Sequence, residues 1–314
     1  MTGVQTCALP ISAVFAIGTE ALAGRGIAES LVETFVFLAV LFAATCHAGW
    51  NAAIKRTLDP LSTTILIGIG AATCALPFTF VFGIPAAESW PWLAASVLIH
   101  LFYFGGLIEA YRAGDMGQVY PIARGSAPLM TATLTTLFVG EHLGPYGWGG
   151  IAMLAAGVLL VSLRGGRDLA RLDRRAVGFA LFTAVTICAY SVVDGVGARL
   201  AGPGMANAYS VWLFVGIAPV VAVYGVIRSG WRMLPAMLPF WRTGLAGGFL
   251  ALASYGIAIW AMTVAPIAIV AALRETSVLF GAVIAVLFLK EPLRVTRVAA
   301  ALMIVCGLTL IRLA

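Results

Sequence analysis

The chain has 314 residues, 61% of them hydrophobic and 10% charged, and a formal net charge of +6. A water-soluble globular domain has about 25% charged residues, so the composition excludes an ordinary soluble enzyme. The basic residues lie between apolar runs rather than in one basic domain, which excludes nucleic acid as a partner and indicates the lipid bilayer.

The first residues differ from the rest of the chain. Residues 1–12 resemble the translation of a common sequencing-adapter oligonucleotide, and we expect them to be an artefact without structural meaning. Residues 13–30 include Glu20, Arg25 and Glu29, which make them too polar for a membrane span. We therefore expect an ill-defined leader up to residue 30.

Apolar runs of membrane-spanning length follow, separated by short charged or Gly/Pro joints, and such runs are typical of transmembrane helices. The alternating patterns of β-strands are missing, which favours helices. The predicted fold class is therefore all-α integral membrane with ten transmembrane helices. The spans are expected at about 31–54, 61–83, 90–111, 117–139, 146–163, 176–198, 206–227, 243–264, 266–289 and 295–313.

A charged joint at 165–175 divides these spans into five and five. One constant shift superposes Arg124 on Arg274 and Glu141 on Glu291, and the matches keep their order along the chain. Residues 31–164 and 176–314 are therefore predicted to be two repeats. Because five is odd, the second repeat enters the membrane from the opposite side. Inverted repeats with a substrate site between them, near the membrane midplane, are typical of secondary transporters.

Short motifs after the fourth and ninth spans carry a family resemblance. They are Gly-Glu-His-Leu at 140–143 and Lys-Glu-Pro-Leu at 290–293, followed by Gly157 and Gly307, and the first span adds His-Ala-Gly-Trp-Asn at 47–51. With the layout of five plus five spans, the chain resembles the drug/metabolite transporter superfamily, specifically proteins with two EamA domains. The resemblance implies a multi-pass protein of the bacterial inner membrane that moves small metabolites without ATP, often outward. It does not specify the substrate.

The orientation of the chain has two conflicting predictions. Most of the 19 lysines and arginines lie in joints that follow odd-numbered spans, including the joint at 165–175. The positive-inside rule places these joints in the cytoplasm and both termini outside. The family resemblance implies the reverse, with both termini in the cytoplasm.

The fourth span carries a charged residue around which the predicted site is organised. Arg124 lies in an apolar run between Pro121 and Pro128. Because a charge within a membrane span is costly, Arg124 is a candidate functional residue. A guanidinium group binds planar anions through two parallel hydrogen bonds, so we predict that Arg124 binds a carboxylate, phosphonate or similar anion. Pro128 removes a hydrogen bond to the Arg124 carbonyl, whereas Val278 stands at the equivalent position, which predicts a loosened helix in the fourth span alone.

Acidic residues in the spans are candidates for proton coupling and charge balance. Arg274 and Glu275 are consecutive, so they project about 100° apart on a helix and cannot pair well with each other. We predict that Glu275 pairs with Arg124 instead. Glu109, Asp194 and Glu275 are candidate proton carriers, because burial disfavours a charged carboxylate. No cofactor other than a coupled proton is expected.

Polar and aromatic side chains from several spans are predicted to join Arg124 in a shared interior, because they cannot face lipid at low cost. His47 and Asn51 project from one helical face, and so do Tyr190 and Asp194 at equivalent positions of the second repeat. The remaining predicted substrate contacts are Tyr120, His100, Tyr103, Tyr255 and Trp260.

Structural alternatives stay open for the charged residues. A clamp that closes the bundle is an equal alternative to substrate contact for Arg124 and Arg274. A hydrogen bond that packs the repeats is an equal alternative to a proton site for Asp194. Glu109 lies near a span end, and the favoured interpretation is that its side chain reaches the membrane interface.

Structural roles are also preferred over functional ones for the histidines and for the glutamates of the two short motifs. His47 and His100 fit hydrogen-bonded interior residues better than metal ligands, because no metal-ligand spacing surrounds them. Glu141 and Glu291 fall at helix boundaries and are predicted to cap helices or fix loops.

The chain lacks the sequence patterns of a phosphate loop, a zinc peptidase or a serine hydrolase, so ATP use and enzymatic activity are unsupported. The predicted function is a secondary transporter, an exporter or exchanger of small polar or amphipathic metabolites such as amino acids or organic anions, which works by alternating access. Two alternatives remain, a membrane-embedded enzyme acting on lipid-linked substrates and a non-transporting membrane subunit. The oligomeric state is not predicted, and a monomer is compatible with this function.

Overall fold

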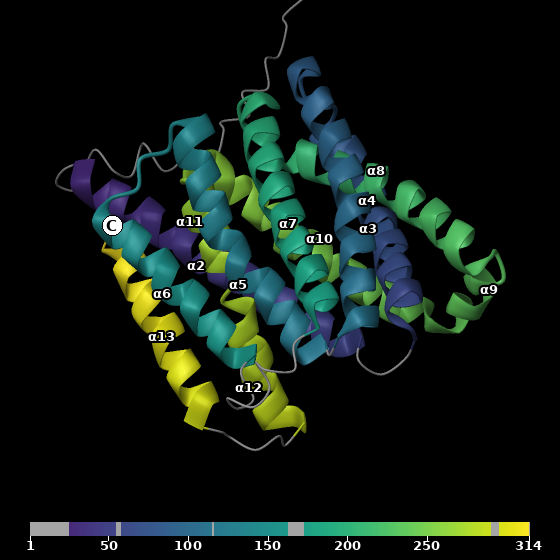
Figure 1. Ribbon diagram of the computed structural model, residues 1–314. Helices are drawn as coiled ribbons and strands as arrows, with labels where there is room; N and C mark the ends of the chain where they lie inside the picture. The colour runs from purple at the N-terminus through teal and green to yellow at the C-terminus, as the bar shows by residue number, and fades with distance from the viewer. Residues whose placement is uncertain (1–24, 55–57, 115, 163–172, 290–294, 314) are drawn as a thin grey trace, which may run out of the picture.

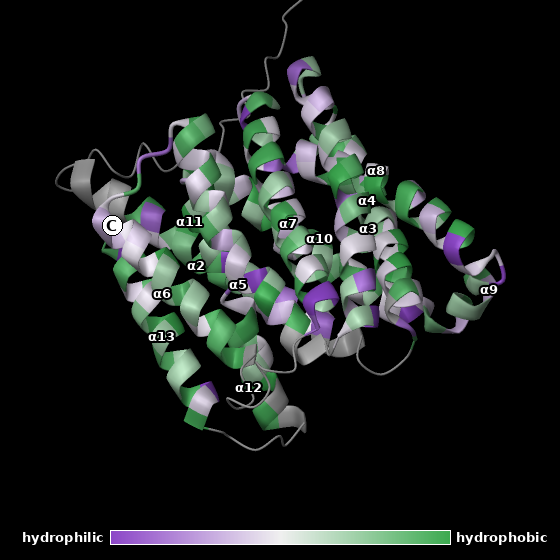
Figure 2. Ribbon diagram, in the orientation of Figure 1, coloured by the Kyte–Doolittle hydropathy of each residue, from purple (hydrophilic) through white to green (hydrophobic). Residues whose placement is uncertain are grey.

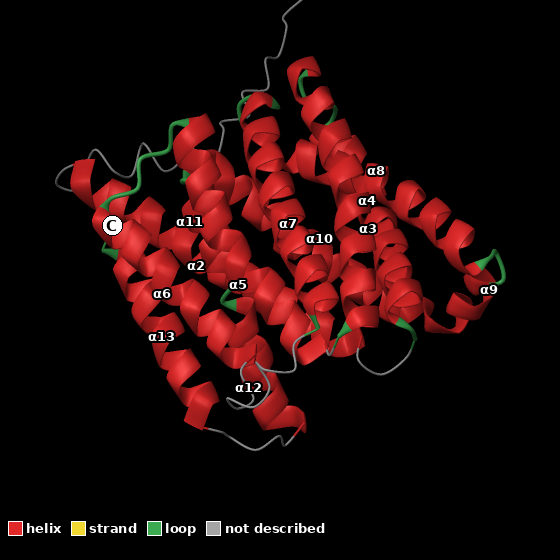
Figure 3. Cartoon of the chain, in the orientation of Figure 1, coloured by secondary structure: helices red, strands yellow, loops and turns green. Residues whose placement is uncertain are grey.

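The computed structural model describes residues 25–54, 58–114, 116–162, 173–289 and 295–313, and these residues form helices and short connections without a strand (Figure 3). The predicted artefact at 1–12, most of the predicted leader and most of the charged joint at 165–175 lie outside the described residues. The leader was predicted to extend to residue 30, but the first described helix already begins at Arg25.

Apart from the earlier start of α2, the helices of the first half lie close to the predicted spans, and some of their ends have a clear physical cause. Asp59, for example, accepts hydrogen bonds from the backbone N–H groups of Leu61 and Ser62, at 3.0 and 3.1 Å, and so caps the second helix. The helices are α2 (Arg25–Ile54), α3 (Pro60–Phe82), α4 (Trp90–Ala113), α5 (Met116–Leu134), extended by a π-helical turn at Thr135–Val139, and α6 (Pro145–Ser162).

The second half differs from the prediction at two places. A short helix, α9, lies in the joint between the seventh and eighth spans, and the predicted ninth span is divided into two helices. The helices are α7 (Arg174–Leu200), α8 (Ala206–Ser229), α9 (Met233–Met237), α10 (Trp241–Val264), α11 (Ile267–Arg274), α12 (Ser277–Leu289) and α13 (Val295–Arg312).

Eight helical segments among the described residues are long and apolar enough to cross a membrane. Hydrophobic residues dominate along the helices of the bundle (Figure 2). The chain is therefore an all-helical, multi-pass membrane protein. The α6 helix is apolar but shorter, and α5, which carries Arg124 and two prolines, is not among the eight. The count of ten spans thus stays a prediction.

Helices from the two halves pack against each other in matched combinations. The α4 helix lies against α7, as α10 lies against α2, and α3 packs between α8 and α10. At the other end of the molecule α6 and α13 lie side by side (Figure 1).

Glycines allow some of these helices to touch backbone to backbone. A Cβ atom added to Gly70 of α3 would lie 2.1 Å from the carbonyl oxygen of Gly244 on α10. A Cβ added to Gly248 would lie 2.2 Å from the backbone nitrogen of Ala71. The Gly244-x-x-x-Gly248 pattern is thus a site of close helix packing.

A break that was not predicted divides the ninth span. The α5 helix, by contrast, continues through Pro121 and Pro128, and the loosening predicted at Pro128 stays a prediction. Proline has a φ compatible with a helix, and the loss of one hydrogen bond is tolerated here. The ninth span instead breaks at Glu275 and Thr276, whose N–H groups bond to carbonyls three residues back. The Thr276 hydroxyl also donates to the Leu273 carbonyl, at 2.7 Å, and such bonds compete with a regular helix.

Candidate functional site

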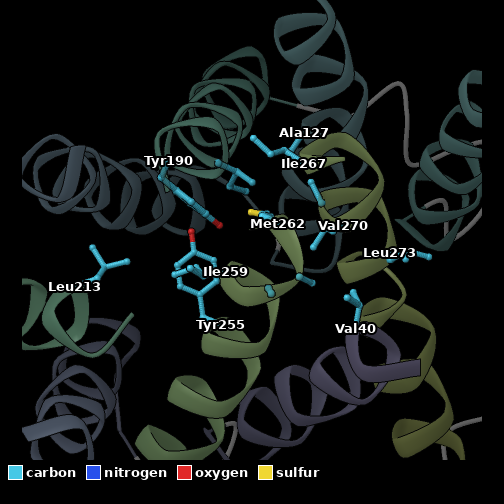
Figure 4. Packing of buried hydrophobic residues seen from close by; sticks show 14 of the residues in the cluster. Val40, Ala127, Tyr190, Leu213, Tyr255, Ile259, Met262, Ile267, Val270 and Leu273 are labelled. Atoms are coloured by element: carbon cyan, nitrogen blue, oxygen red, sulfur yellow. The ribbon is translucent and has the colours of Figure 1, made fainter. Parts of the chain in front are cut away.

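Charged and aromatic side chains are buried together where α4, α5, α7 and α10 surround the break between α11 and α12. We call this group the central cluster. Figure 4 shows two of its members, Tyr190 of α7 and Tyr255 of α10, which point toward one another among the buried residues, with ring centroids 5.8 Å apart. The central cluster consists of His100, Arg124, Tyr190, Asp194, Tyr255, Arg274 and Glu275, each less than 9% exposed.

Arg124 and Glu275 form a buried ion pair. The Arg124 Nε atom lies 2.8 Å from Glu275 Oε2, and the two side chains are 2% and 4% exposed. The N–H of Nε does not point along this contact, so the two atoms attract as charges without a well-aligned hydrogen bond. Arg124 Nη2 also donates to the Ser277 hydroxyl at 3.4 Å. The predicted pairing of Arg124 with Glu275 is confirmed.

Arg274 is buried without such a partner. It is 7% exposed, and its guanidinium carbon lies 4.5 Å from the centre of the Tyr255 ring. Within the described part of the chain, no carboxylate lies at ion-pair distance from Arg274, and no group accepts a hydrogen bond from it. The ring face offers a favourable cation–π contact, but it leaves the guanidinium N–H groups available to another acceptor.

Asp194 is held by two tyrosine hydroxyls and has no exposed surface. Tyr209 of α8 donates to Asp194 Oδ1 at 2.9 Å, and Tyr255 donates to Oδ2. Tyr255 therefore connects Asp194 to Arg274, since its hydroxyl donates to Asp194 while its ring lies under the Arg274 guanidinium. Sequence reasoning missed Tyr209, and its position as a tyrosine near the start of an apolar span is the signal that could have identified it.

His100 belongs to an aromatic stack in the central cluster. Its ring lies parallel to that of Tyr190, with centroids 4.4 Å apart and an interplanar angle of 23°. His100 Nδ1 lies 2.9 Å from the Ser96 carbonyl oxygen, which can only accept, so Nδ1 carries the proton. Tyr103 approaches Tyr190 edge-on at 5.7 Å. His100 is thus a hydrogen-bonded interior residue, as the preferred structural interpretation predicted.

Three further predicted residues lie beside the central cluster. His47 packs edge-on against Trp50, at 5.1 Å between ring centroids. It also interacts electrostatically with Arg124 and Arg274. Tyr120 lies one turn before Arg124, whose guanidinium carbon is 5.8 Å from its ring centre. Asn51 instead donates its side-chain amide to the His47 carbonyl of its own helix, at 2.8 Å.

Two predicted residues make their contacts elsewhere. Trp260 packs edge-on against Phe35 of α2, at 5.9 Å, and makes no ring contact with Tyr255 among the described residues. Glu109 lies near the end of α4, where it pairs with Arg112 at 3.0 Å and with Arg228 at 2.8 Å. The structure places Glu109 at the helix end, in agreement with the preferred reading as an interface residue.

Glu141 caps a helix of the other half. Its Oε1 atom accepts from the Ile267 N–H at 2.7 Å, and its Oε2 atom accepts from the Ala268 N–H at 3.2 Å. These are the first N–H groups of α11, where a carboxylate is favourable. The prediction that Glu141 caps a helix is confirmed, whereas Glu291 lies outside the described residues.

The comparison with known families agrees with this arrangement. The model of the EamA-like transporter family matches residues 34–163. The first half of the chain is thus similar to an EamA-like transporter domain. It supplies His47, His100, Arg124 and Glu141, whereas Asp194, Tyr255, Arg274 and Glu275 come from the second half, outside the match.

Two further proteins are similar to this chain, one in sequence and one in fold. An "uncharacterized transporter in cobO 3' region" from a Sinorhizobium species is 29% identical over 160 residues, which cover 49% of this chain and 92% of that protein. A crystal structure of another protein, 15% identical, superposes with a TM-score of 0.68 over 88% of this chain and 95% of that one, and shows a shared fold. The match to the EamA-like transporter family, the transporter-named protein and the long apolar helices together support a multi-pass membrane transporter.

Proposed function

We propose that this chain is a secondary transporter of the inner membrane that exports or exchanges small organic anions, including amino acids, by alternating access. The substrate carries a carboxylate or a similar planar anion, which binds Arg274 in the central cluster. No ATP takes part, and a proton accompanies the anion. The two halves act as inverted repeats of five spans that rock around the central cluster.

The observation that carries the proposal is the isolation of Arg274. Among the described residues no carboxylate lies at ion-pair distance from Arg274, and a buried guanidinium group without such a partner is costly in a membrane interior, which supports an anion site there. Five N–H donors in a planar fork suit a carboxylate, and the Tyr255 ring holds the guanidinium from one side.

This assignment gives the two arginines different roles. Sequence reasoning favoured Arg124 for the substrate, with Arg274 and Glu275 balancing its charge. In the structure the charge of Arg124 is already balanced by Glu275 at 2.8 Å. Arg124 is therefore assigned to holding the break between α11 and α12 in place, and Arg274 to binding the anion.

The surroundings of the central cluster favour transport over chemistry at a membrane surface. Arg124, Asp194 and Glu275 are buried among helices, whereas an enzyme acting on lipid-linked substrates needs polar groups that are open to the membrane interface. Discontinuous helices beside the substrate are a recurring feature of transporters with inverted repeats, and the break after Arg274 is such a feature. The matched packing of α4 on α7 and α10 on α2 supports two related halves.

Proton coupling follows from the charges of the central cluster. When Asp194 is ionised, Asp194 and Glu275 together balance Arg124 and Arg274. When Asp194 holds a proton, one positive charge remains in excess and the anion binds more tightly. Linkage then requires that the anion also favours protonation of Asp194, so the two move together.

Flux into proteoliposomes tests the proposal. We would measure counterflow of radiolabelled amino acids and mono- and dicarboxylates with the wild type, Arg274→Gln and Arg274→Lys. Loss of a charged hydrogen-bonding partner is worth about 3 kcal/mol, so Arg274→Gln should lower flux of the best substrate about 100-fold. Arg242→Gln, which removes an exposed arginine of α10, should keep wild-type flux. A well-folded Arg274→Gln protein with wild-type flux, or a wild type that moves no anion, would contradict the proposal.

A further inference from the structure

A groove with a volume of about 630 Å³ opens on the surface of the bundle between α4, α7 and α8. Its floor contains Gly105 and Gly106 of α4. The lack of a side chain leaves space at Gly105, whereas the Phe182 ring packs against Gly106. Aromatic rings form its walls, and two of them, Phe102 and Phe182, are 53% and 44% exposed. In a membrane protein such exposed rings face lipid chains, so this part of the groove is an apolar surface on the outside of the helix bundle.

One end of the groove is basic. Arg112 and Arg228 line it, and both donate to the same Oε1 atom of Glu109, at 3.0 and 2.8 Å. Their side chains are 57% and 38% exposed, so among the described residues most of their N–H groups are open to another acceptor. Arg175 lies over the ring of Phe179, which lines the same end, with its guanidinium carbon 5.7 Å from the ring centre. Three arginines therefore surround a groove end in which Glu109 supplies one negative charge.

The order of these groups along the groove matches a phospholipid. On α4 the lining runs from Leu101 to Arg112, which corresponds to about 16 Å of helix and a large part of one acyl chain. The apolar section comes first, and the cationic section lies at the helix end, where the membrane interface is expected. Arg112 and Arg228 also follow odd-numbered predicted spans, which the basic-residue count assigns to the cytoplasmic side.

We propose that this groove binds one anionic phospholipid of the surrounding membrane, with an acyl chain against Phe102, Gly105 and Phe182 and the headgroup phosphate between Arg112 and Arg228. The excess positive charge selects a lipid with net negative charge over a zwitterionic one. The site is separate from the central cluster and does not depend on which substrate is transported.

Native mass spectrometry of the full chain tests the site by counting the lipids that remain bound. The purified protein is titrated with phosphatidylglycerol or with phosphatidylcholine of the same chain lengths. Two arginines near a membrane surface contribute roughly 30-fold to binding of an anionic lipid, so phosphatidylglycerol should bind about 30-fold more tightly. Arg112→Gln/Arg228→Gln should remove this preference. Arg232→Gln/Arg242→Gln, which lowers the net charge equally at exposed positions, should keep it.

A second variant fills the groove without changing charge. A Cβ at Gly105 would meet only the Tyr224 hydroxyl, at 3.8 Å, so Gly105→Phe projects a ring into the groove without a backbone clash. This variant should lose both lipids, whereas Gly281→Phe on α12, where a Cβ meets nothing within 4 Å, should bind them as the wild type does. Equal binding of the two lipids by the wild type would overturn the proposal. So would wild-type lipid binding by Gly105→Phe, or a groove that proves to hold a second copy of the chain or the transported substrate instead of lipid.

Discussion

Glu141 and Arg199 form an ion pair, 2.8 Å between Oε1 and Nη2, that connects the joint between α5 and α6 in the first half to the end of α7 in the second. Arg199 lies at the end of α7 and also donates to the carbonyl oxygens of Met262 and Ala265, at 2.9 and 3.2 Å. Glu141 accepts from the first N–H groups of α11. The two residues thus satisfy backbone groups on both sides of the α10–α11 joint.

Replacing Glu141 should therefore loosen this joint. Glu141→Gln removes the ion pair and one of the two acceptors at the start of α11, and we expect a loss of about 2 kcal/mol in stability. Thermal unfolding in detergent should show a lower melting temperature. The matched control is Glu88→Gln, which changes an exposed glutamate and should leave the melting temperature unchanged. Equal melting temperatures for the two variants would show that the joint does not depend on Glu141.

The ion pair of Arg124 and Glu275 should be coupled in a double-mutant cycle. Either Arg124→Met or Glu275→Gln leaves one charge buried without its partner, which costs about 3–5 kcal/mol. The double variant removes both charges of the pair, so neither is left buried without its partner. It should therefore be more stable than the less stable single variant. Melting temperatures of the four proteins measure the coupling, and strictly additive losses would contradict it. A transport defect of Arg124→Met alone must accordingly be judged against its stability.

Much of this bundle could be predicted from the sequence, because long apolar runs can satisfy their backbone groups in lipid only as helices. The pairing of Arg124 with Glu275 was also predictable, since Arg274 and Glu275 project in different directions and Arg124 needed a partner. The close packing at Gly244 and Gly248 follows from the spacing of small residues.

Other features depend on which helices become neighbours, and a single sequence does not show this. The isolation of Arg274 became visible only once Glu275 was placed against Arg124 and Tyr255 under the guanidinium. The same holds for Tyr209 and its bond to Asp194 across two helices. The break at Glu275 and Thr276 was missed because proline is the usual signal of a broken helix. Here the helix is interrupted without a proline, at polar residues whose side chains can bond to the backbone.

Close packing of α3 on α10 gives a prediction with a control on the same helix. In Gly70→Ala the new Cβ would lie 2.1 Å from the Gly244 carbonyl oxygen, so the two helices must separate. Overpacking of this kind costs about 1–3 kcal/mol, and the melting temperature in detergent should fall. Gly68 lies only two residues away but about 200° around the same helix, and a Cβ at Gly68 meets nothing within 4 Å. Gly68→Ala should be as stable as the wild type or slightly more stable.

The pH dependence of transport should depend on Asp194. A gradient of one pH unit corresponds to about 1.4 kcal/mol, so one-to-one coupling allows the wild type to accumulate the anion about tenfold. Asp194→Asn keeps the shape of the side chain but stays neutral, so the positive charge of Arg274 is in excess at every pH. Exchange of the anion should continue, and accumulation driven by the pH gradient should disappear.

Paired measurements of exchange and of gradient-driven uptake in proteoliposomes separate this role from a structural one. Asp173→Asn is the control, because Asp173 caps the same helix, α7, at an exposed position and asparagine caps equally well. It should keep both activities. If Asp194→Asn retained gradient-driven uptake, the proton would bind elsewhere, and Asp194 would be a packing residue that Tyr209 and Tyr255 hold between α7, α8 and α10. Loss of both activities in a protein with wild-type melting temperature would likewise assign Asp194 to shaping the central cluster and not to carrying the proton.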